Sequence, residues 1–283
     1  MNVITTVAEV RQAVRAWKSR GDKVAFVPTM GNLHAGHLRL VEEARQMANR
    51  VIVSIFVNPL QFGENEDFSA YPRTLNEDIK QLDKYHVDFV FHPETKEIYP
   101  ENPATHTRVE VPEVSNILCG AFRANHFVGV ATVVNKLFNI VQPDVALFGK
   151  KDYQQLIIIQ RMVRDLCMPI DVVGLDTVRE RDGLAMSSRN HYLSEDERQR
   201  APVLYQTLCW GKQTLLQGRL DLAEIEQEGR RLLSEAGFRP DYFSIREDYS
   251  LNTPTDNTKN FVIVAAAWLG KARLIDNIVI QIE

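Results

Sequence analysis

The stretch Lys23-Val24-Ala25-Phe26-Val27-Pro28-Thr29-Met30-Gly31-Asn32-Leu33-His34-Ala35-Gly36-His37 decides the fold of this chain. Its first five residues are typical of a buried strand, and the apolar spacing from Leu38 onward predicts a helix. His34 and His37 are therefore expected on one face of the first helical turn. Unpaired backbone N–H groups and the positive end of the helix dipole favour an anion at that turn. The pattern indicates a nucleotide site, with both imidazoles neutral while it is empty.

Two other interpretations of the histidines stay open at this point. Gly31 and Gly36 permit tight turns and a close approach by a ligand, but the same residues fit an ordinary helix start with two surface histidines. A zinc site is less well supported, because the pair supplies only two ligands and metalloprotease helices space their histidines at i, i+4. The strand before the pair and the helix after it favour the nucleotide site. The sequence identifies no metal ligand.

Composition bounds the possible classes of protein. The chain has 283 residues, 45% of them hydrophobic and 25% charged, which suffices for one large or two modest domains. A net charge of −4 gives no electrostatic footprint for nucleic acid or anionic lipid. The apolar runs are strand-sized and the N-terminus lacks the pattern of a signal peptide, so no membrane partner is expected. Three scattered cysteines, at 119, 167 and 209, favour a reduced, cytoplasmic protein.

Strands and helices are predicted to alternate through the first two-thirds of the chain. Near-continuous runs of Val, Ile and Phe predict strands at residues 24–27, 51–57, 87–91, 145–148 and 170–173. Helices are predicted between them at residues 38–48, 75–85, 130–141 and 153–166, and Thr74 to Glu77 form a candidate capping box for the second. The alternation predicts an α/β fold, a Rossmann-like doubly wound parallel sheet.

The pattern changes after about residue 178. A long helix is predicted from residue 194 toward 216, another from 222 to 236, and strands at 242–246, 261–268 and 272–282. Helices followed by closely linked strands indicate a smaller α+β domain with an antiparallel sheet. We therefore expect domains at residues 1–178 and 179–283.

Three further polar clusters follow predicted strands. They are residues 58–63, 149–155 and 182–190. Ligands of open α/β sheets bind outside the carboxyl ends of the strands, so the joint placement of these clusters predicts one ligand site. The acidic loop at residues 64–67 is expected to be solvated.

The same segments resemble a known family. The motifs are Pro28-Thr29-Met30-Gly31 with His34-Ala35-Gly36-His37, Phe56-Val57-Asn58-Pro59-Leu60-Gln61-Phe62, Tyr71-Pro72-Arg73-Thr74, Phe148-Gly149-Lys150-Lys151-Asp152-Tyr153-Gln154-Gln155, and Met186-Ser187-Ser188-Arg189-Asn190. Together with Arg123, His126 and Phe127, they resemble the pantothenate synthetases, adenylate-forming ligases of the HIGH-motif nucleotidyltransferase superfamily. The resemblance runs from near the N-terminus to about Leu193, and the helices and strands beyond it fit the family's small C-terminal domain.

The resemblance implies a two-step reaction with ATP as a substrate and Mg²⁺ as its companion. The carboxylate of pantoate attacks the α-phosphorus, and the amine of β-alanine then attacks the acyl adenylate to give pantothenate. It implies catalytic roles for His34, His37 and Lys151, in a homodimer whose domain at residues 179–283 forms a lid over the site. The implied ATP-binding residues are Met30, Gly31, Asn32, Leu33, His34, Ala35, Gly36, His37, Gly149, Lys150, Lys151, Asp152, Val178, Met186, Ser187, Ser188 and Arg189. The implied substrate-binding residues are Gln61, Gln155, Asn58 and Arg123.

Several alternatives to this interpretation remain open. For the second step, water, a phosphate oxygen or His37 are all candidate bases. A nucleotidyltransferase of the same superfamily would leave the nucleotide on its product, and a non-catalytic nucleotide sensor would have little use for the two histidines, Lys151 and Arg189 together. A hydrolase is disfavoured, since neither G-x-S-x-G nor a Walker A loop occurs in the sequence.

Overall fold

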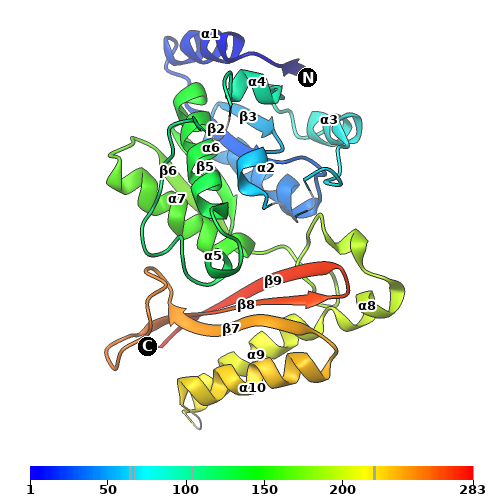
Figure 1. The fold of residues 1–283 in the computed structure, drawn as a ribbon. Coiled ribbons are helices and arrows are strands. Elements are labelled where there is room, and N and C mark those ends of the chain that lie inside the picture. Colours follow the sequence, from blue (N-terminus) through cyan, green and yellow to red (C-terminus); the bar gives the residue numbers. More distant parts are fainter. Residues whose placement is uncertain (64–65, 67, 103–104, 219–220, 283) are drawn as a thin grey trace. The chain divides into compact units, whose positions relative to one another are not determined.

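The computed structural model describes residues 1–283 except 64–65, 67, 103–104, 219–220 and 283. The chain divides into two compact units, drawn in Figure 1. Unit 1 comprises Met1–Lys150 and Ile158–Asp176, and unit 2 comprises Lys151–Ile157 and Thr177–Glu283.

Unit 1 is built on a parallel sheet. In its described residues six strands pair in the order β1-β4-β3-β2-β5-β6, and all of these pairings are parallel. The strands are β1 (Asn2–Ile4), β2 (Val24–Thr29), β3 (Arg50–Ile55), β4 (Phe89–Phe91), β5 (Val145–Gly149) and β6 (Asp171–Leu175). The chain runs from β2 outward to β4 and returns on the other side of β2 as β5, so the order reverses between β2 and β5.

Helices cover both faces of this sheet. Ala25 and Val27 pack in one apolar cluster with Val41 of α2 (Ala35–Met47), whereas Phe26 meets Phe138 of α6 (His126–Val141) with ring centroids 6.4 Å apart. Successive side chains of a strand point to opposite faces, so α2 and α6 lie on opposite sides of the sheet. The predicted doubly wound sheet is confirmed.

Unit 1 begins with a strand and a helix that were not predicted from the sequence. Strand β1 and helix α1 (Val7–Lys18) precede the first predicted strand, and Trp17 of α1 stacks on Phe89 of β4 at 5.1 Å. The other helical segments of the first two-thirds of the chain are η1 (Pro59–Gln61), α3 (Leu75–Asp83), α4 (Thr95–Ile98), α5 (Cys119–Phe122), η3 (Lys150–Asp152) and α7 (Tyr153–Asp165). The division between the units falls within α7.

The predicted capping box of α3 is wrong. Thr74 precedes the helix, but its side chain caps no backbone N–H. The hydroxyl instead donates to the carboxylate of Asp78, 3.3 Å away. The backbone of Thr74 has φ −116° and ψ 40°, outside the extended region usual for an N-cap residue, so its hydroxyl turns to Asp78 and not to the first helical turn.

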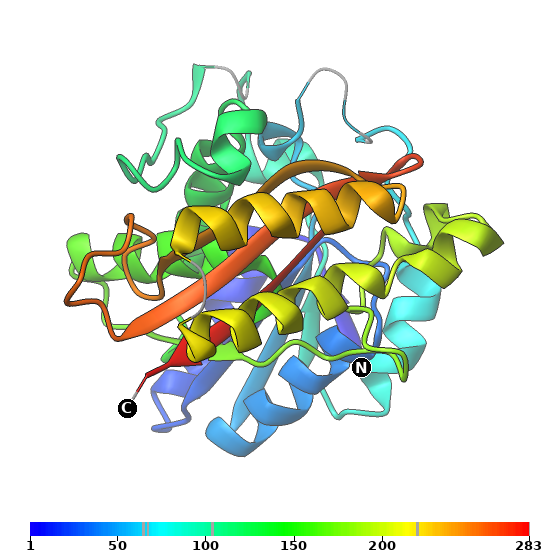
Figure 2. The ribbon, with the colours of Figure 1, turned by 90° about the horizontal axis from the view of Figure 1, so that it is seen from below.

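Unit 2 contains the predicted antiparallel sheet. Its strands β7 (Arg239–Glu247), β8 (Asn260–Leu269) and β9 (Ala272–Gln281) pair in chain order. Helices α9 (Val203–Gln217) and α10 (Leu222–Glu235) pack side by side against this sheet (Figures 1 and 2). Phe243 and Ile263 from the sheet and Leu208 from α9 are fully or almost fully buried in the core between these layers.

The long helix predicted from residue 194 is two helices. Ser194 caps α8 (Glu195–Arg200) by a capping box with Glu197, and α9 begins only at Val203, after Pro202. Proline lacks an N–H and clashes with the preceding helical turn, so the chain bends there. The short segment η4 (Asn190–Tyr192) precedes α8.

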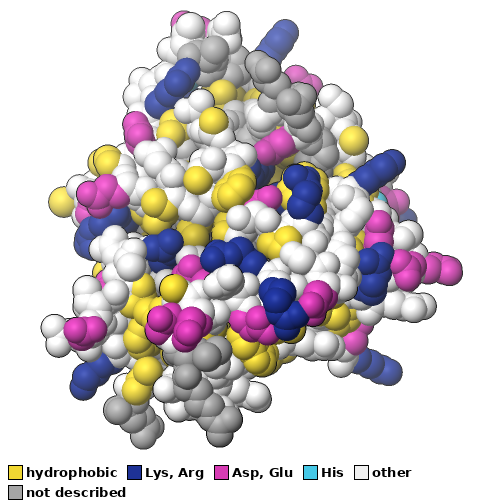
Figure 3. Space-filling model, turned by 60° about the horizontal axis from the view of Figure 1, so that its bottom comes forward, with side chains coloured by type: hydrophobic (Ala, Val, Ile, Leu, Met, Phe, Trp, Pro, Cys, Tyr) yellow, Lys and Arg dark blue, Asp and Glu magenta, His cyan; other side chains and the backbone are white. Residues whose placement is uncertain are grey.

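The surface carries both signs of charge. Figure 3 shows Lys and Arg side chains interspersed with Asp and Glu side chains on the face that it presents. Among the described residues, none of the helices combines the length and the apolar character needed to span a bilayer.

Candidate functional site

The side chains of His34 and His37 cap the N-terminus of α2. His34 is the N-cap residue, and its Nδ1 accepts the backbone N–H of Gly36 at 3.2 Å. Nδ1 of His37 accepts the N–H of His34 at 3.4 Å, and the two ring centroids are 4.1 Å apart. Each Nδ1 is an acceptor, so the proton of each neutral imidazole lies on Nε2. The predicted placement of both rings on the first helical turn is confirmed, and each ring carries an Nε2–H donor.

A buried carboxylate holds the loop that leads into α2. Asp78 of α3 is 1% exposed and accepts the N–H groups of Asn32 at 2.9 Å and Leu33 at 2.8 Å. The loop turns at Gly31, whose φ is +82°, and a Cβ there would lie 3.0 Å from Ile55. Gly31 is therefore needed for both the conformation and the space. Asp78 lies 46 residues away from Asn32 in the sequence, and its contribution was not predicted.

The amide of Gln61 has a fixed orientation. Asn58 is 1% exposed, and its amide donates to Oε1 of Gln61 at 3.2 Å and to the carbonyl of Gly129 at 3.1 Å. Its Oδ1 accepts the hydroxyl of Tyr99 at 2.9 Å and the N–H of Leu60 at 3.3 Å. All four hydrogen-bonding positions of the Asn58 amide are therefore used within the protein.

Gln61 consequently presents a donor. Its Oε1 faces Asn58, and its Nε2 lies 3.0 Å from the sulfur of Met30, which follows β2. Helix α6 packs closely against η1, the turn that carries Gln61. A Cβ added to Gly129 of α6 would lie only 2.2 Å from the carbonyl oxygen of Leu60 in that turn. The sequence-predicted residues Met30, Asn58 and Gln61 are thus brought together.

Arg123 holds the backbone at Gln61. Its guanidinium donates to Glu66 at 2.7 and 2.5 Å, to Nε2 of His126 at 2.9 Å, and to the Gln61 carbonyl at 3.4 Å. Nδ1 of His126 lies 2.7 Å from the same carbonyl, so this ring donates from Nδ1 and accepts at Nε2. The contacts engage Arg123 in a network that fixes the backbone beside Gln61.

The expectation of a solvated acidic loop is wrong for Glu66. Burial raises the pKa of this carboxyl, but the hydrogen bonds and charge of Arg123 outweigh burial and leave the pKa below its ordinary value of 4.5. An ion pair with Arg123, 57 residues away, holds the carboxylate in place. The other residues of that loop, Glu64, Asn65 and Asp67, lie outside the described residues.

The histidine loop and the first lysine segment leave neighbouring strands. His34 follows β2 and Lys150 follows β5, which pairs with β2 at the point where the strand order reverses. Crevices at such switch points are where doubly wound sheets bind ligands. The ammonium of Lys150 lies 2.7 Å from the carboxylate of Asp176, and both side chains are exposed.

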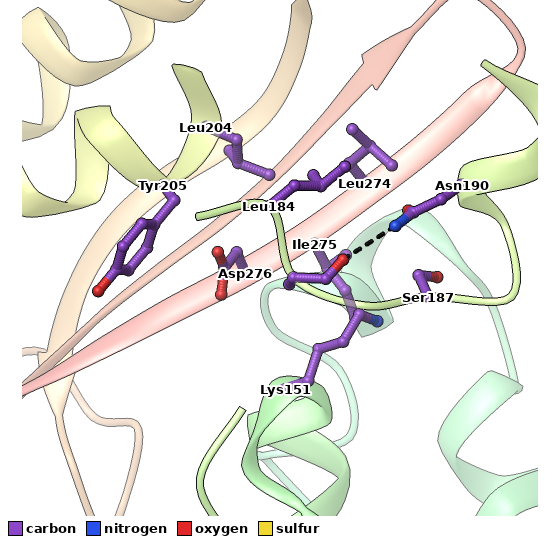
Figure 4. A pocket seen from close by; sticks show the side chains of 10 residues that line it. Lys151, Leu184, Ser187, Asn190, Leu204, Tyr205, Leu274, Ile275 and Asp276 are labelled. Atoms are coloured by element: carbon purple, nitrogen blue, oxygen red, sulfur yellow. Dashed lines mark hydrogen bonds between the residues drawn. The ribbon is translucent and has the colours of Figure 1, made fainter. Parts of the chain in front are cut away.

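Gly149 ends β5 in unit 1, and unit 2 holds the predicted residues Lys151, Asp152, Gln155, Val178 and Met186 to Arg189. Lys151 and Ser187 line one small pocket together with Tyr205, Asp276 and the apolar side chains of Leu184, Leu204, Leu274 and Ile275 (Figure 4). The ammonium of Lys151 lies 3.8 Å from the carboxylate of Asp152, and Gln155 lies in the first turn of α7. Lys151 therefore lines the same pocket as Ser187, the first residue of the serine-arginine segment, residues 187–189.

A short hairpin positions that segment. The N–H of Met186 donates to the carbonyl of Val178 at 3.0 Å, and the turn passes through Gly183, with a φ of +95°. The hydroxyl of Ser187 then accepts the N–H of Arg189 at 3.2 Å. Asn190 donates to the Ala185 carbonyl at 3.1 Å, drawn as the dashed line in Figure 4. Val178 and Met186, both predicted to contact ATP, are thus paired through their backbones.

The described residues offer no preformed metal cage. Among them, no group of three or more His, Cys, Asp or Glu side chains is arranged to hold a metal ion. A metal ion that accompanies a nucleotide needs no such cage, because phosphate oxygens and water supply most of its ligands.

The fold and the position of these residues define the class of protein as a Rossmann-like α/β protein with its candidate site at the switch point. Residues 2–279 match the family model described as Pantoate-beta-alanine ligase. The chain therefore belongs to the pantoate–β-alanine ligase family, and it is an enzyme of that family.

Known proteins are similar to this chain over its whole length. It is 55% identical to a pantothenate synthetase of Nitrosococcus oceani, covering 100% of this chain and 99% of that protein. A crystal structure of pantothenate synthetase from Thermus thermophilus is 47% identical, with a TM-score of 0.91 over 98% of this chain and 99% of that one. A pantoate–β-alanine ligase from Francisella tularensis, complexed with β-γ ATP and β-alanine, is 34% identical, with a TM-score of 0.83 over 99% and 97% of the two chains.

Proposed function

We propose that this chain uses ATP to condense pantoate with β-alanine, through pantoyl adenylate, and releases pyrophosphate and AMP. The observation that carries the proposal is the pair of Nε2–H donors of His34 and His37 at the N-terminus of α2, beside the switch point of the sheet. The Francisella tularensis relative, whose structure contains β-γ ATP and β-alanine, supports the same substrates.

Alignment and charge neutralisation carry the first step. Pantoate is ionised near neutral pH, so its carboxylate attacks the α-phosphorus without a general base. The two Nε2–H groups and the positive end of the α2 dipole stabilise the phosphates and the transition state, since the N–H groups of Gly36 and His37 already donate within the turn. Lys151, with Lys150 in support, stabilises the departing pyrophosphate. Because these donors are already oriented, little reorganisation is needed when charge moves.

The remaining predicted residues bind the nucleotide. Ser187, Ser188 and Arg189 close over the phosphates, while Met30, Gly149, Asp152, Val178 and Met186 hold the nucleoside. Residues 1–178 bind ATP and pantoate, and residues 179–283 act as a lid. Mg²⁺ would accompany ATP and would neutralise part of its phosphate charge, held mainly by phosphate oxygens and water.

Gln61 and Gln155 recognise pantoate. Gln61 donates from Nε2, since its Oε1 is held by Asn58, and a donor suits either the carboxylate or a hydroxyl oxygen of pantoate. Asn58 and Arg123 support this contact by fixing the side chain and the backbone of Gln61. In the second step the amine of β-alanine must lose a proton, and water or a phosphate oxygen accepts it, because Nε2 of His37 carries a proton and its Nδ1 accepts the N–H of His34.

The protein is proposed to work as a homodimer in the cytoplasm. Its three cysteines are free thiols, as expected in a reducing compartment. Sedimentation equilibrium measures the mass directly, and a monomer at assay concentrations would contradict the dimer.

Labelled pyrophosphate exchange tests the reaction. The proposal predicts exchange into ATP that requires pantoate, followed by AMP release only after β-alanine is added. Exchange without pantoate, or a product that keeps AMP, would indicate a nucleotidyltransferase. Nucleotide binding with neither exchange nor AMP release would indicate a sensor.

A further inference from the structure

A buried ion pair lies beside Lys151 in unit 2. The carboxylate of Asp276 on β9 is 3% exposed and accepts hydrogen bonds from both terminal nitrogens of Arg179, at 2.6 and 2.9 Å. The guanidinium of Arg179 lies 3.5 Å from the centroid of the Tyr205 ring. A bidentate pair of this kind fixes both direction and distance, and removal of either partner leaves a buried charge without compensation.

The same guanidinium fastens the hairpin that carries the serine-arginine segment. Arg179 donates to the carbonyl of Gly183 at 3.1 Å, and its backbone pairs with Ala185 across the hairpin. The ring of Tyr205 packs against the turn of the hairpin, since a Cβ added to Gly183 would lie 2.9 Å from that ring. The hairpin that leads into Ser187 is therefore anchored to β9.

The next residue of β9 anchors Lys151. The side-chain amide of Asn277 donates to the backbone carbonyl of Lys151 at 3.0 Å, 126 residues away in the sequence. The backbone N–H of Asn277 donates in turn to Asp276 at 2.8 Å. Two consecutive residues of one strand thus hold the backbone at Lys151 and the hairpin before Ser187, and Figure 4 shows Lys151, Ser187 and Asp276 around one pocket.

We propose that Asn277, supported by the Arg179–Asp276 ion pair, is a positioning residue that fixes Lys151 against the serine-arginine segment for the adenylation step. This inference rests on the proposed function, in which Lys151 stabilises the departing pyrophosphate. A displacement of about 1 Å in a catalytic group can lower a rate by roughly 10²-fold. Loss of the anchor should therefore affect the chemical step more than substrate binding.

Asn277→Asp tests the anchor with little change in size. A carboxylate cannot donate to the Lys151 carbonyl, so kcat of pantoate-dependent pyrophosphate exchange should fall by about 10-fold while KM for pantoate changes by less than about 2-fold. Asn277→Leu, which adds no charge, should show the same division between kcat and KM. If both variants keep the kcat of the unmodified protein, the inference is overturned.

A double-mutant cycle shows whether the anchor acts through Lys151. In a Lys151→Ala background, Asn277→Asp should lower kcat by less than about 2-fold, because the group that it positions is gone. An undiminished effect of about 10-fold in that background would overturn the positioning role. A fully active Lys151→Ala variant would overturn the role assigned to Lys151 and this inference with it. A defective Lys151→Ala variant with normal Asn277 variants would overturn this inference alone.

The ion pair has a matched control on the same strand. Arg273 of β9 binds Asp241 of β7 at 2.8 Å, and the two side chains are 11% and 9% exposed. Asp276→Asn and Asp241→Asn each weaken one largely buried pair, so both should lower the melting temperature. Only Asp276→Asn should lower kcat of exchange, and an equal loss of kcat in both variants would mean that the Arg179–Asp276 pair acts through general stability.

Discussion

Replacing Gly129 with alanine should impair pantoate recognition while leaving the fold largely intact. Gly129 lies in α6 with its Cα against the turn η1, which carries Gln61. An added Cβ would meet the carbonyl oxygen and carbon of Leu60 at 2.2 and 2.5 Å, and the nitrogen of Gln61 at 2.8 Å. All three atoms belong to the backbone, so no side-chain rotation relieves the overlap.

The size of the displacement follows from these distances. Carbon and oxygen need about 3.4 Å, so α6 and η1 must separate by roughly 1.2 Å. The hydrogen bond from Asn58 to the Gly129 carbonyl, now 3.1 Å, would be lost by a shift of that size along the bond. Overpacking costs about 1–3 kcal/mol, and alanine offsets about 1 kcal/mol of that in a helix. The stability loss should therefore be modest.

The effect on activity should be larger. Gln61 moves with its backbone, and a misplacement of about 1 Å in a positioning group lowers a rate by about 10²-fold. Pantoate-dependent pyrophosphate exchange should show this loss in kcat/KM for pantoate. Gly63→Ala is the control, because the nearest described atom to its Cβ would belong to the flexible side chain of Glu66, at 3.7 Å. Wild-type kcat/KM in Gly129→Ala would refute the reasoning.

Three further outcomes are expected. His34→Ala and Lys151→Ala should each lower adenylation by roughly 10²-fold, the range for lost transition-state donors, with an unchanged circular dichroism spectrum; normal turnover would remove that residue from the mechanism. The pKa of Glu66 lies below its ordinary value of 4.5, so its ionised form stabilises the fold fully above that pH, and the contribution is lost as the pH falls through the lower folded pKa. Urea unfolding of the natural protein and of Glu66→Gln should therefore differ near neutral pH and converge in acid, whereas a difference that persists at every pH would contradict the ion-pair argument. Asp78→Asn removes one of two acceptors for the histidine loop and should lower the free energy of unfolding by about 1–3 kcal/mol. Asp83→Asn, on the exposed side of the same helix, should lower it far less. Equal losses on thermal unfolding would refute this role for Asp78.

Local patterns predicted most of the framework. Continuous Val, Ile and Phe runs located the parallel strands from β2 to β6, and apolar periodicity located α2 and α7 to within three residues at either end. The first strand was missed because β1 combines Asn2 with only two apolar residues, Val3 and Ile4, and so gives no continuous apolar run. The helix from residue 194 was predicted too long because the effect of Pro202 on the backbone was not weighed against the periodicity around it.

The candidate site, too, could be predicted from the sequence only in part. The residue types of the histidine loop, of Asn58 with Gln61, and of Lys151 with the serine-arginine segment are recognisable in the sequence because each motif is contiguous. The residues that hold these motifs in place cannot be recognised in the sequence. Asp78, Tyr99 and Asp276 act on residues 41 or more positions away, and each is an ordinary side chain in its own segment.

The sequence by itself determined the alternation of strands and helices, the anion-favouring start of α2 and the family of the chain. These properties depend on neighbouring residues and on backbone geometry that repeats about every two or 3.6 residues. Only the tertiary structure decided which buried groups fix the orientation of Gln61, the histidine loop and the Lys151 backbone. A hydrogen bond needs two atoms within about 3 Å, and folding alone brings residues from distant segments to that distance.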